Sequence, residues 1–181
     1  QKGSPIQLAN WHAESEANLK ASGLAHTILQ PTMFMQNTFE NAYTIKNEGK
    51  VYFATKNGRL PVVDTVDIAA TAAAVLANPS GHNGKTYYLT GPEALTMAQQ
   101  CEKISKVAGK TVTYVDIPSS ALADNLKKFG VPEWMAKDFA VMNDFFATDG
   151  GAQTSNDVEK VTGRKARSFD AFLADNAAAF K

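Results

Sequence analysis

The 181-residue chain has little of several features that mark whole classes of protein. It has a single cysteine, Cys101, which excludes an internal disulfide framework and fits a reducing, cytoplasmic compartment. No apolar run approaches the roughly 20 residues needed to cross a bilayer, so no membrane segment is expected. Eighteen basic residues balance eighteen acidic ones, and the charges are scattered. A basic surface for nucleic acid or anionic lipid is therefore not expected either.

Motifs that bind phosphate or metal are also missing. The chain has no G-x-G-x-x-G and no P-loop, so it lacks the backbone cradle that holds a phosphate. Its three histidines, His12, His26 and His82, lie far apart, and with one cysteine they form no metal-ligand spacing. There is no G-x-S-x-G turn of a hydrolase. We predict no metal site.

What is present is the pattern of one α/β domain. The hydrophobic content of 44% is ordinary for a globular domain, and no linker or repeat divides residues 1–181. Periodicity and turn residues predict helices over 10–22, 32–47, 65–77, 132–147, 155–162 and 168–180, and strands over 24–29, 51–53, 60–63, 86–89 and 111–115. Asn10 and Asp64 (or Thr65) are the expected N-caps of the first and third helices. This alternation is typical of a mainly parallel sheet.

Only two of these strands, 25–29 and 86–89, have the apolar character of a central sheet. Two parallel strands leave a sheet edge and its faces without partners. We therefore expect further strands from outside the chain. The isolated chain should form a homo-oligomer or pair with a missing N-terminal half.

A series of short motifs runs in order along most of the chain. They are Trp11-His12-Ala13-Glu14-Ser15-Glu16, Leu19-Lys20-Ala21-Ser22-Gly23-Leu24, Thr27-Ile28-Leu29-Gln30-Pro31, Phe34-Met35-Gln36-Asn37, Val66-Asp67-Ile68-Ala69, Tyr88-Leu89-Thr90-Gly91-Pro92 and Val161-Thr162-Gly163-Arg164. Each motif alone is weak. In this order and spacing the chain resembles the NmrA-like family, of the atypical short-chain dehydrogenase/reductase class.

The resemblance implies a Rossmann-like parallel sheet that binds NADP(H) or NAD(H). In such folds the phosphate-binding glycines lie in the first βα turn, which by this resemblance precedes Gln1. Residues 1–181 would then be the C-terminal part of the domain. They would supply the end of the sheet, the nicotinamide-side loop and a helical substrate-binding portion.

His12 is the candidate catalytic residue by the same resemblance. Extended short-chain dehydrogenases carry a Y-x-x-x-K pair before a glutamate on one helix. If Glu16 is that glutamate, His12 takes the lysine position and Leu8 the tyrosine position. Leucine cannot donate a proton, so His12 would contact the nicotinamide ribose or a substrate oxygen and act as the acid. The alternative is a histidine at a helix start, hydrogen-bonded to backbone.

Other candidate site residues lie at the end of the predicted strand, where open α/β sheets bind ligands. Besides His12, the resemblance assigns four residues to the cofactor: Pro31, Thr32, Met33 and Phe34. Gln30 stands where the family usually has arginine. The candidate substrate-binding residues are Trp11, Phe34, Asn37 and Phe139. For Trp11 and for the stripe of 134–146 that contains Phe139, plain core packing is the alternative, and Met35 is expected in the core.

The function implied is an NAD(P)H-dependent oxidoreductase that reduces a quinone-like or small apolar carbonyl substrate by hydride transfer. One alternative is a non-catalytic NADP(H)-sensing regulator, which the leucine at position 8 favours. Another is an interaction module that lacks the nucleotide site. Cys101 is expected to be buried and inert, Asp67 to be a helix-start carboxylate, and Arg164 to be solvated or capping.

Overall fold

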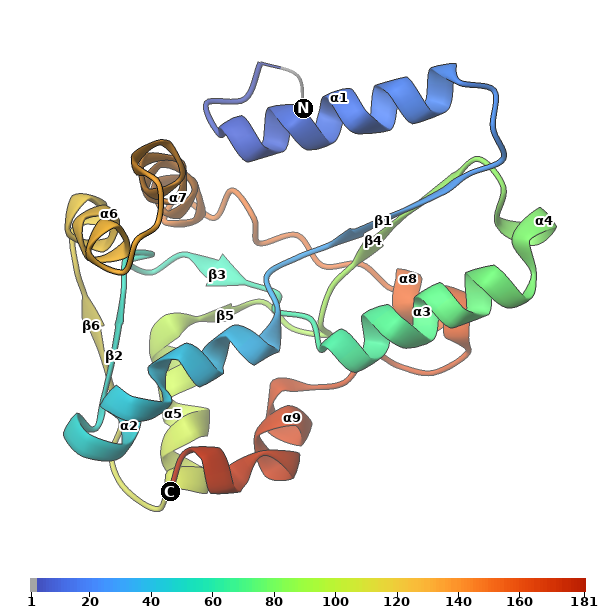
Figure 1. The fold of residues 1–181 in the computed structure, drawn as a ribbon. Coiled ribbons are helices and arrows are strands. Elements are labelled where there is room, and N and C mark those ends of the chain that lie inside the picture. Colours follow the sequence, from blue (N-terminus) through green and yellow to red (C-terminus); the bar gives the residue numbers. More distant parts are fainter. Residues whose placement is uncertain (1–2) are drawn as a thin grey trace.

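A computed structural model describes residues 3–181, so Gln1 and Lys2 of the expected domain lie outside it. Two parallel strands, β1 (Thr27–Pro31) and β4 (Lys85–Leu89), form a two-stranded sheet, with Thr27 opposite Lys85 and Pro31 opposite Leu89. Helix α1 (Gln7–Ala21) runs along one side of this pair and α3 (Thr65–Ala77) along the other (Figure 1). The α/β prediction and the parallel pair are confirmed.

We call this part of the molecule the β1–β4 layer. It also contains α4 (Pro79–His82) and α8 (Asp157–Thr162). Its buried cluster is small and consists of Val63, Leu89 and Val158.

The second part, which we call the α5 lobe, is built around α5 (Met97–Ala108). The strands are β2 (Lys50–Phe53), parallel to β6 (Thr113–Asp116), and β3 (Arg59–Leu60), antiparallel to β5 (Leu95–Thr96); the other helices are η1 (Met35–Asn41), α2 (Ala42–Glu48), α9 (Phe169–Asp175) and η2 (Ala177–Ala179). The main core lies here and comprises Met35, Ile45, Val51, Leu60, Val62, Leu95, Met97, Cys101, Ile104, Val112, Phe169, Phe172, Leu173 and Phe180.

A helical hairpin completes the fold. Its helices α6 (Ser119–Lys128) and α7 (Glu133–Phe146) pack against each other, and α7 lies near the start of α1 (Figure 1). No helix formed by residues 3–181 combines the length and the apolar character needed to cross a membrane.

The predicted N-cap is correct for one helix and wrong for another. Asp64 caps α3 as expected, with its side chain accepting the Val66 N–H at 3.0 Å. Asn10 does not cap α1, so that prediction is wrong. Its side chain instead accepts the backbone N–H groups of Gly3 and Ser4, and α1 begins three residues earlier, after Ile6.

The expected helix over 32–47 and the expected strand over 60–63 are both shorter in the structure. The Val63 N–H donates to Met33 O and the Met35 N–H donates to Val63 O, each at 2.9 Å. These bonds hold the chain beside Val63 rather than in a helix, so helical structure begins only at Met35. The strand prediction is reduced to Arg59–Leu60.

Candidate functional site

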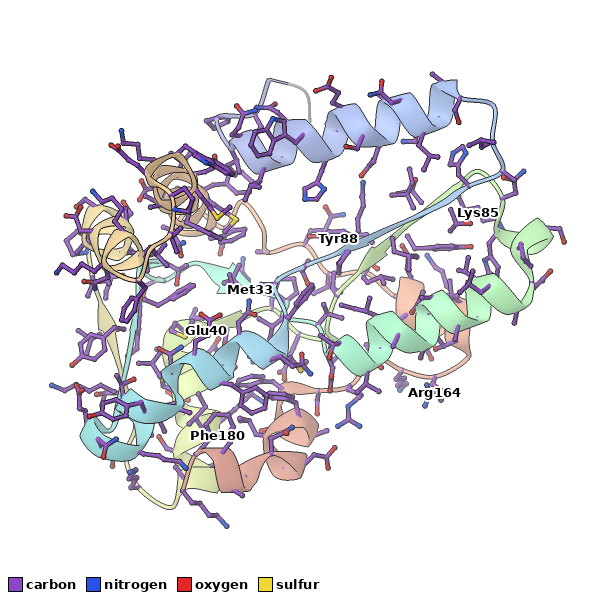
Figure 2. The ribbon with its side chains drawn as sticks, in the orientation of Figure 1. Met33, Glu40, Lys85, Tyr88, Arg164 and Phe180 are labelled. Atoms are coloured by element: carbon purple, nitrogen blue, oxygen red, sulfur yellow. The ribbon has the colours of Figure 1, made fainter. Side chains whose placement is uncertain are left out.

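The chain that leaves the C-terminal end of β1 is held as a fixed shelf, which we define as residues 32–37. Thr32 Oγ1 donates to Pro61 O at 2.8 Å, and the two bonds through Val63 follow directly. Figure 2 shows Met33 where β1 passes into η1, beside β3. The shelf therefore stands at the strand end where an open α/β sheet binds its ligands.

The side chains of the shelf differ in burial: one is anchored in the core and others are exposed. Met35 is 1% exposed and belongs to the main core, as expected. Phe34 is 39% exposed, and Asn37 is also exposed. Pro31, at the end of β1, is exposed as well. The shelf thus presents the ring of Phe34 and the amide of Asn37, while the buried Met35 between them fixes the shelf to the core.

A buried polar network supports the shelf, and sequence reasoning missed it. Gln36 Nε2 donates to Asp64 Oδ1, and Arg167 Nε donates to Asp64 Oδ2, both at 2.7 Å. Burial alone would raise the pKa of Asp64, which is 2% exposed. Donors from Val66, Gln36 and Arg167 outweigh that effect and hold this pKa below its ordinary value.

Asp67 belongs to the same network, but its pKa is shifted in the opposite direction. It is buried in the first turn of α3 and accepts the Arg167 N–H at 2.7 Å. Burial, with the nearby charge of Asp64, raises the pKa of Asp67 above its ordinary value. The expected helix-start role is correct, and the contact across 100 residues is additional. Arg164 is exposed, as expected.

Helix α1 is attached to the shelf end of β1. Glu16 Oε1 accepts a hydrogen bond from Gln30 Nε2 at 2.7 Å, and Gln30 lies one residue before the strand ends. His12 and Leu8 precede Glu16 by one and two turns, so all three share a helix face. His12 is exposed, and its ring makes no hydrogen bond to any residue in the described range 3–181. The imidazole is thus available on the face turned toward the end of β1.

Helix α7 caps the start of α1. The carboxylate of Asp138, 5% exposed, accepts the N–H groups of Gln7 at 2.5 Å and Leu8 at 2.9 Å. A carboxylate at this end also complements the helix dipole. One turn on, the Trp11 ring meets Trp134 edge to face, with centroids 5.1 Å apart. The helix that carries His12 is therefore positioned by α7.

The apolar stripe of α7 is only partly buried. The buried residues of this helix are Ala136, Asp138 and Asn143. Trp134 and Phe145 are 45% and 43% exposed, and Phe139 is half-buried. Phe146 of this stripe packs against the main core, while Trp134 and Phe145 beside it keep accessible surface.

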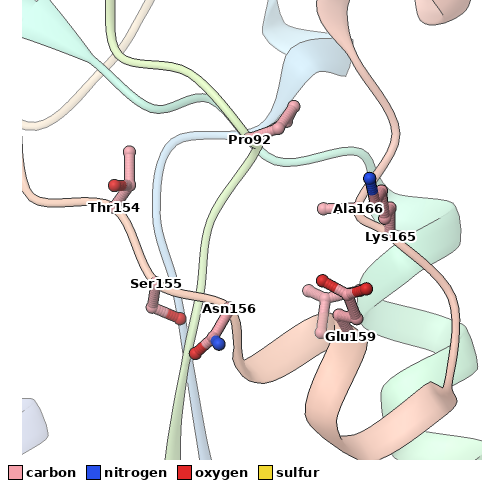
Figure 3. Close-up of a pocket in the computed structure, with 8 residues that line it drawn as sticks. Pro92, Thr154, Ser155, Asn156, Glu159, Lys165 and Ala166 are labelled. Atoms are coloured by element: carbon pink, nitrogen blue, oxygen red, sulfur yellow. The ribbon is translucent and has the colours of Figure 1, made fainter.

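Two hollows among the described residues differ in size and in the residues that line them. The larger, about 460 Å³, lies between α8 and the loop before it (Figure 3) and is lined by Pro92, Thr154, Ser155, Asn156, Val158, Glu159, Lys165 and Ala166. None of the candidate residues lines it. The smaller, about 30 Å³, is lined by Met33, Phe34, Asn37, Thr38, Asn41, Val51, Phe53, Val62, Met97, Gln100 and Ile104.

The structure therefore brings three candidate residues, Met33, Phe34 and Asn37, to one cavity. His12 and Trp11 lie on α1 and Phe139 on α7, outside that cavity lining. Among residues 3–181 there is no group of three or more potential metal ligands. Burial raises the pKa of the Cys101 thiol to about 12, which keeps it protonated and unreactive, as expected.

The chain is similar to several known proteins. The model of the NmrA-like family matches residues 11–173. An NAD(P)H azoreductase of Xenophilus azovorans is 37% identical over 98% of this chain and 62% of its own length. Quinone oxidoreductase 2 of Escherichia coli K12 is 34% identical over 82% of this chain and 51% of its own. A crystal structure of an NADPH-dependent quinone oxidoreductase from Escherichia coli superposes with a TM-score of 0.85 at 28% identity, over 97% of this chain and 63% of that one.

Proposed function

Since this chain belongs to the NmrA-like family, we propose that it is the C-terminal part of an NAD(P)H-dependent oxidoreductase domain. Its substrate is a quinone-like or small apolar carbonyl compound. The chain spans about three fifths of the length of the azoreductase and of the superposed quinone oxidoreductase. The observation that carries the proposal is the rigid shelf at the end of β1, which presents Phe34 and Asn37 beside the helix that bears His12.

The shelf fits the nicotinamide end of NADP(H) or NAD(H). Its backbone is fixed in advance, and the exposed ring of Phe34 offers a flat apolar surface. The residues that would hold the nicotinamide and its ribose are His12, Pro31, Thr32, Met33 and Phe34. Residues 3–181 contain no glycine-rich phosphate loop, so they fit this end of the cofactor only. When bound, the cofactor supplies the hydride.

His12 supplies the proton that a reduced quinone or carbonyl oxygen must gain. Leucine at position 8 cannot do so, and the exposed imidazole is the acid on the same helix face. Trp11, Phe34, Asn37 and Phe139 line the path of the substrate. The partly exposed apolar stripe of α7 supports an apolar substrate, because those side chains are accessible to it.

The parallel sheet extends beyond the β1–β4 pair. Within the described range, β1 pairs only with β4, so each of these strands has an edge without a partner strand there. A second copy of the chain or a polypeptide carrying the glycine-rich half covers such an edge. The single free cysteine supports a cytoplasmic location.

A titration with NADPH of the chain joined to a polypeptide that carries the glycine-rich half, followed by duroquinone-dependent oxidation of NADPH, tests the proposal. We expect saturable binding and turnover, and a loss of about a hundredfold in kcat for His12→Ala. His26→Ala is the matched control, because His26 lies at the opposite end of β1 and bonds to Leu24 O. Binding without turnover would favour a nucleotide sensor. No binding at all would favour an interaction module.

A further inference from the structure

The small cavity beside the shelf contains a buried amide that has no partner. Gln100, on α5, is 4% exposed, and its Nε2 forms no hydrogen bond with any residue in the range 3–181. Gln100 lines the cavity together with Met33, Phe34 and Asn37. Buried donors are rarely left unpaired in native proteins, because desolvation then costs them their bonds to water. Nε2 itself is almost inaccessible, so an acceptor atom in the cavity meets it only when the Gln100 side chain turns toward the cavity.

The rest of the lining selects a neutral acceptor. Apolar side chains form most of the wall, and the remaining polar groups are Asn37, Thr38 and Asn41. No charged side chain lines the cavity. A carboxylate or phosphate would be desolvated there without a counter-charge, whereas a carbonyl or quinone oxygen needs only a hydrogen bond.

The size of the cavity limits what enters it. Its volume of about 30 Å³ corresponds to two or three water molecules, since each needs roughly 10–15 Å³. One oxygen-bearing end of a substrate fits, and an aromatic ring does not. The ring would remain outside, next to Phe34, whose side chain is 39% exposed.

We propose that Gln100 is a specificity-determining residue whose Nε2 donates a hydrogen bond to a substrate oxygen other than the one that His12 protonates, such as the second oxygen of a quinone. The inference rests on the proposed function, because the cavity shares Met33 and Phe34 with the nicotinamide-binding stretch proposed above. A water molecule offers the same acceptor oxygen when no substrate is bound. The experiment must therefore separate an acceptor carried by a substrate from a resident water.

Equilibrium dialysis of the 181-residue chain against two molecules of the same shape makes that separation. Duroquinone carries two oxygens, and durene is the hydrocarbon without them; full ring substitution also prevents addition to thiols. We expect Gln100→Leu to weaken duroquinone binding by about three- to tenfold and to leave durene binding unchanged. Thr55→Val is the matched control, since Thr55 Oγ1 is also buried and unpaired but does not line the cavity.

A second readout does not depend on how the variant folds. The side-chain amide signals of Gln100 in a ¹H–¹⁵N spectrum of the unmodified chain should shift with duroquinone and not with durene. Equal losses for both ligands in Gln100→Leu, or unshifted amide signals, would show that the amide serves only a water. Failure of the unmodified chain to bind duroquinone would also overturn the inference.

Parallel assays of NADPH consumption keep the two proposals apart. Duroquinone binding that depends on Gln100, without NADPH consumption, would retain the oxygen subsite and reject the reductase. Consumption of NADPH with duroquinone that is indifferent to Gln100→Leu would retain the reductase and reject the subsite.

Discussion

The β1–β4 layer and the α5 lobe bury their apolar side chains to very different extents. Fourteen buried residues form the main cluster of the α5 lobe, whereas the cluster of the β1–β4 layer has three. In the layer, Leu24 is 66% exposed and Leu76 is 76% exposed. The comparison shows that the lobe carries its own hydrophobic core, whereas the layer, from which the shelf leaves, buries few apolar side chains of its own.

The largest expected effect comes from a core truncation in the lobe. Phe172→Ala removes a fully buried ring from the main cluster and should lower the free energy of unfolding by about 3–5 kcal/mol. Leu76→Ala in the layer is the control and should change it by less than about 0.5 kcal/mol, because that side chain is exposed. Urea denaturation measures both. Equal losses would show that the layer has a core of its own.

The junction between the two regions is the next place to disturb. A Cβ on Gly91 would lie 2.2 Å from Val62 O, so Gly91→Ala must displace backbone next to the shelf. We expect a loss of about 1–3 kcal/mol in the free energy of unfolding. Gly109→Ala meets no atom within 4 Å and has only the strain of its φ of +68°, about 1 kcal/mol. A smaller loss at Gly91 than at Gly109 would mean that the junction is loose.

A third prediction concerns the contact between α7 and α1. Asp138→Asn weakens the charged cap on the N–H groups of Gln7 and Leu8 and should cost about 1 kcal/mol. Hydrogen exchange should accelerate in the first turn of α1 and not in the α5 lobe. Asp144→Asn changes the same residue type on the same helix at an exposed position. Unchanged exchange in α1 would show that the cap does not hold it.

The smallest effect is a pair of opposite pH dependences inside the polar network. The lowered pKa of Asp64 contributes stability that is present above its ordinary value of 3.8 and is lost as pH falls through the folded-state value. The raised pKa of Asp67 contributes stability that is present below 3.8 and is lost as pH rises through the folded-state value.

Thermal melts between pH 3 and pH 7 test this pair through two variants of equal shape. The deficit of Asp64→Asn relative to the unmodified chain should grow as pH rises through the acid range. Any deficit of Asp67→Asn should shrink over the same range. Parallel curves for the two variants would contradict the opposite shifts.

Local sequence patterns predicted a good part of this structure. The apolar strands, the Asp64 cap, and the burial of Met35 and Cys101 were predicted, because each depends on neighbours a few residues away. The N-cap prediction was wrong at Asn10, because the backbone N–H groups of Gly3 and Ser4 before α1 donate to its side chain instead. Helix 32–47 failed because Val63, distant in sequence, holds its first residues by backbone hydrogen bonds.

The sequence by itself determined the α/β class, the parallel strand pair and the family to which the chain belongs, since periodicity and ordered motifs are written along the chain. Only the tertiary structure decided which side chains support the site. Arg167 reaches Asp64 across 103 residues, Asp138 reaches Gln7 across 131, and Gln100 meets the shelf from another helix. Such contacts arise from the packing of whole elements against one another, and no local spacing encodes that packing.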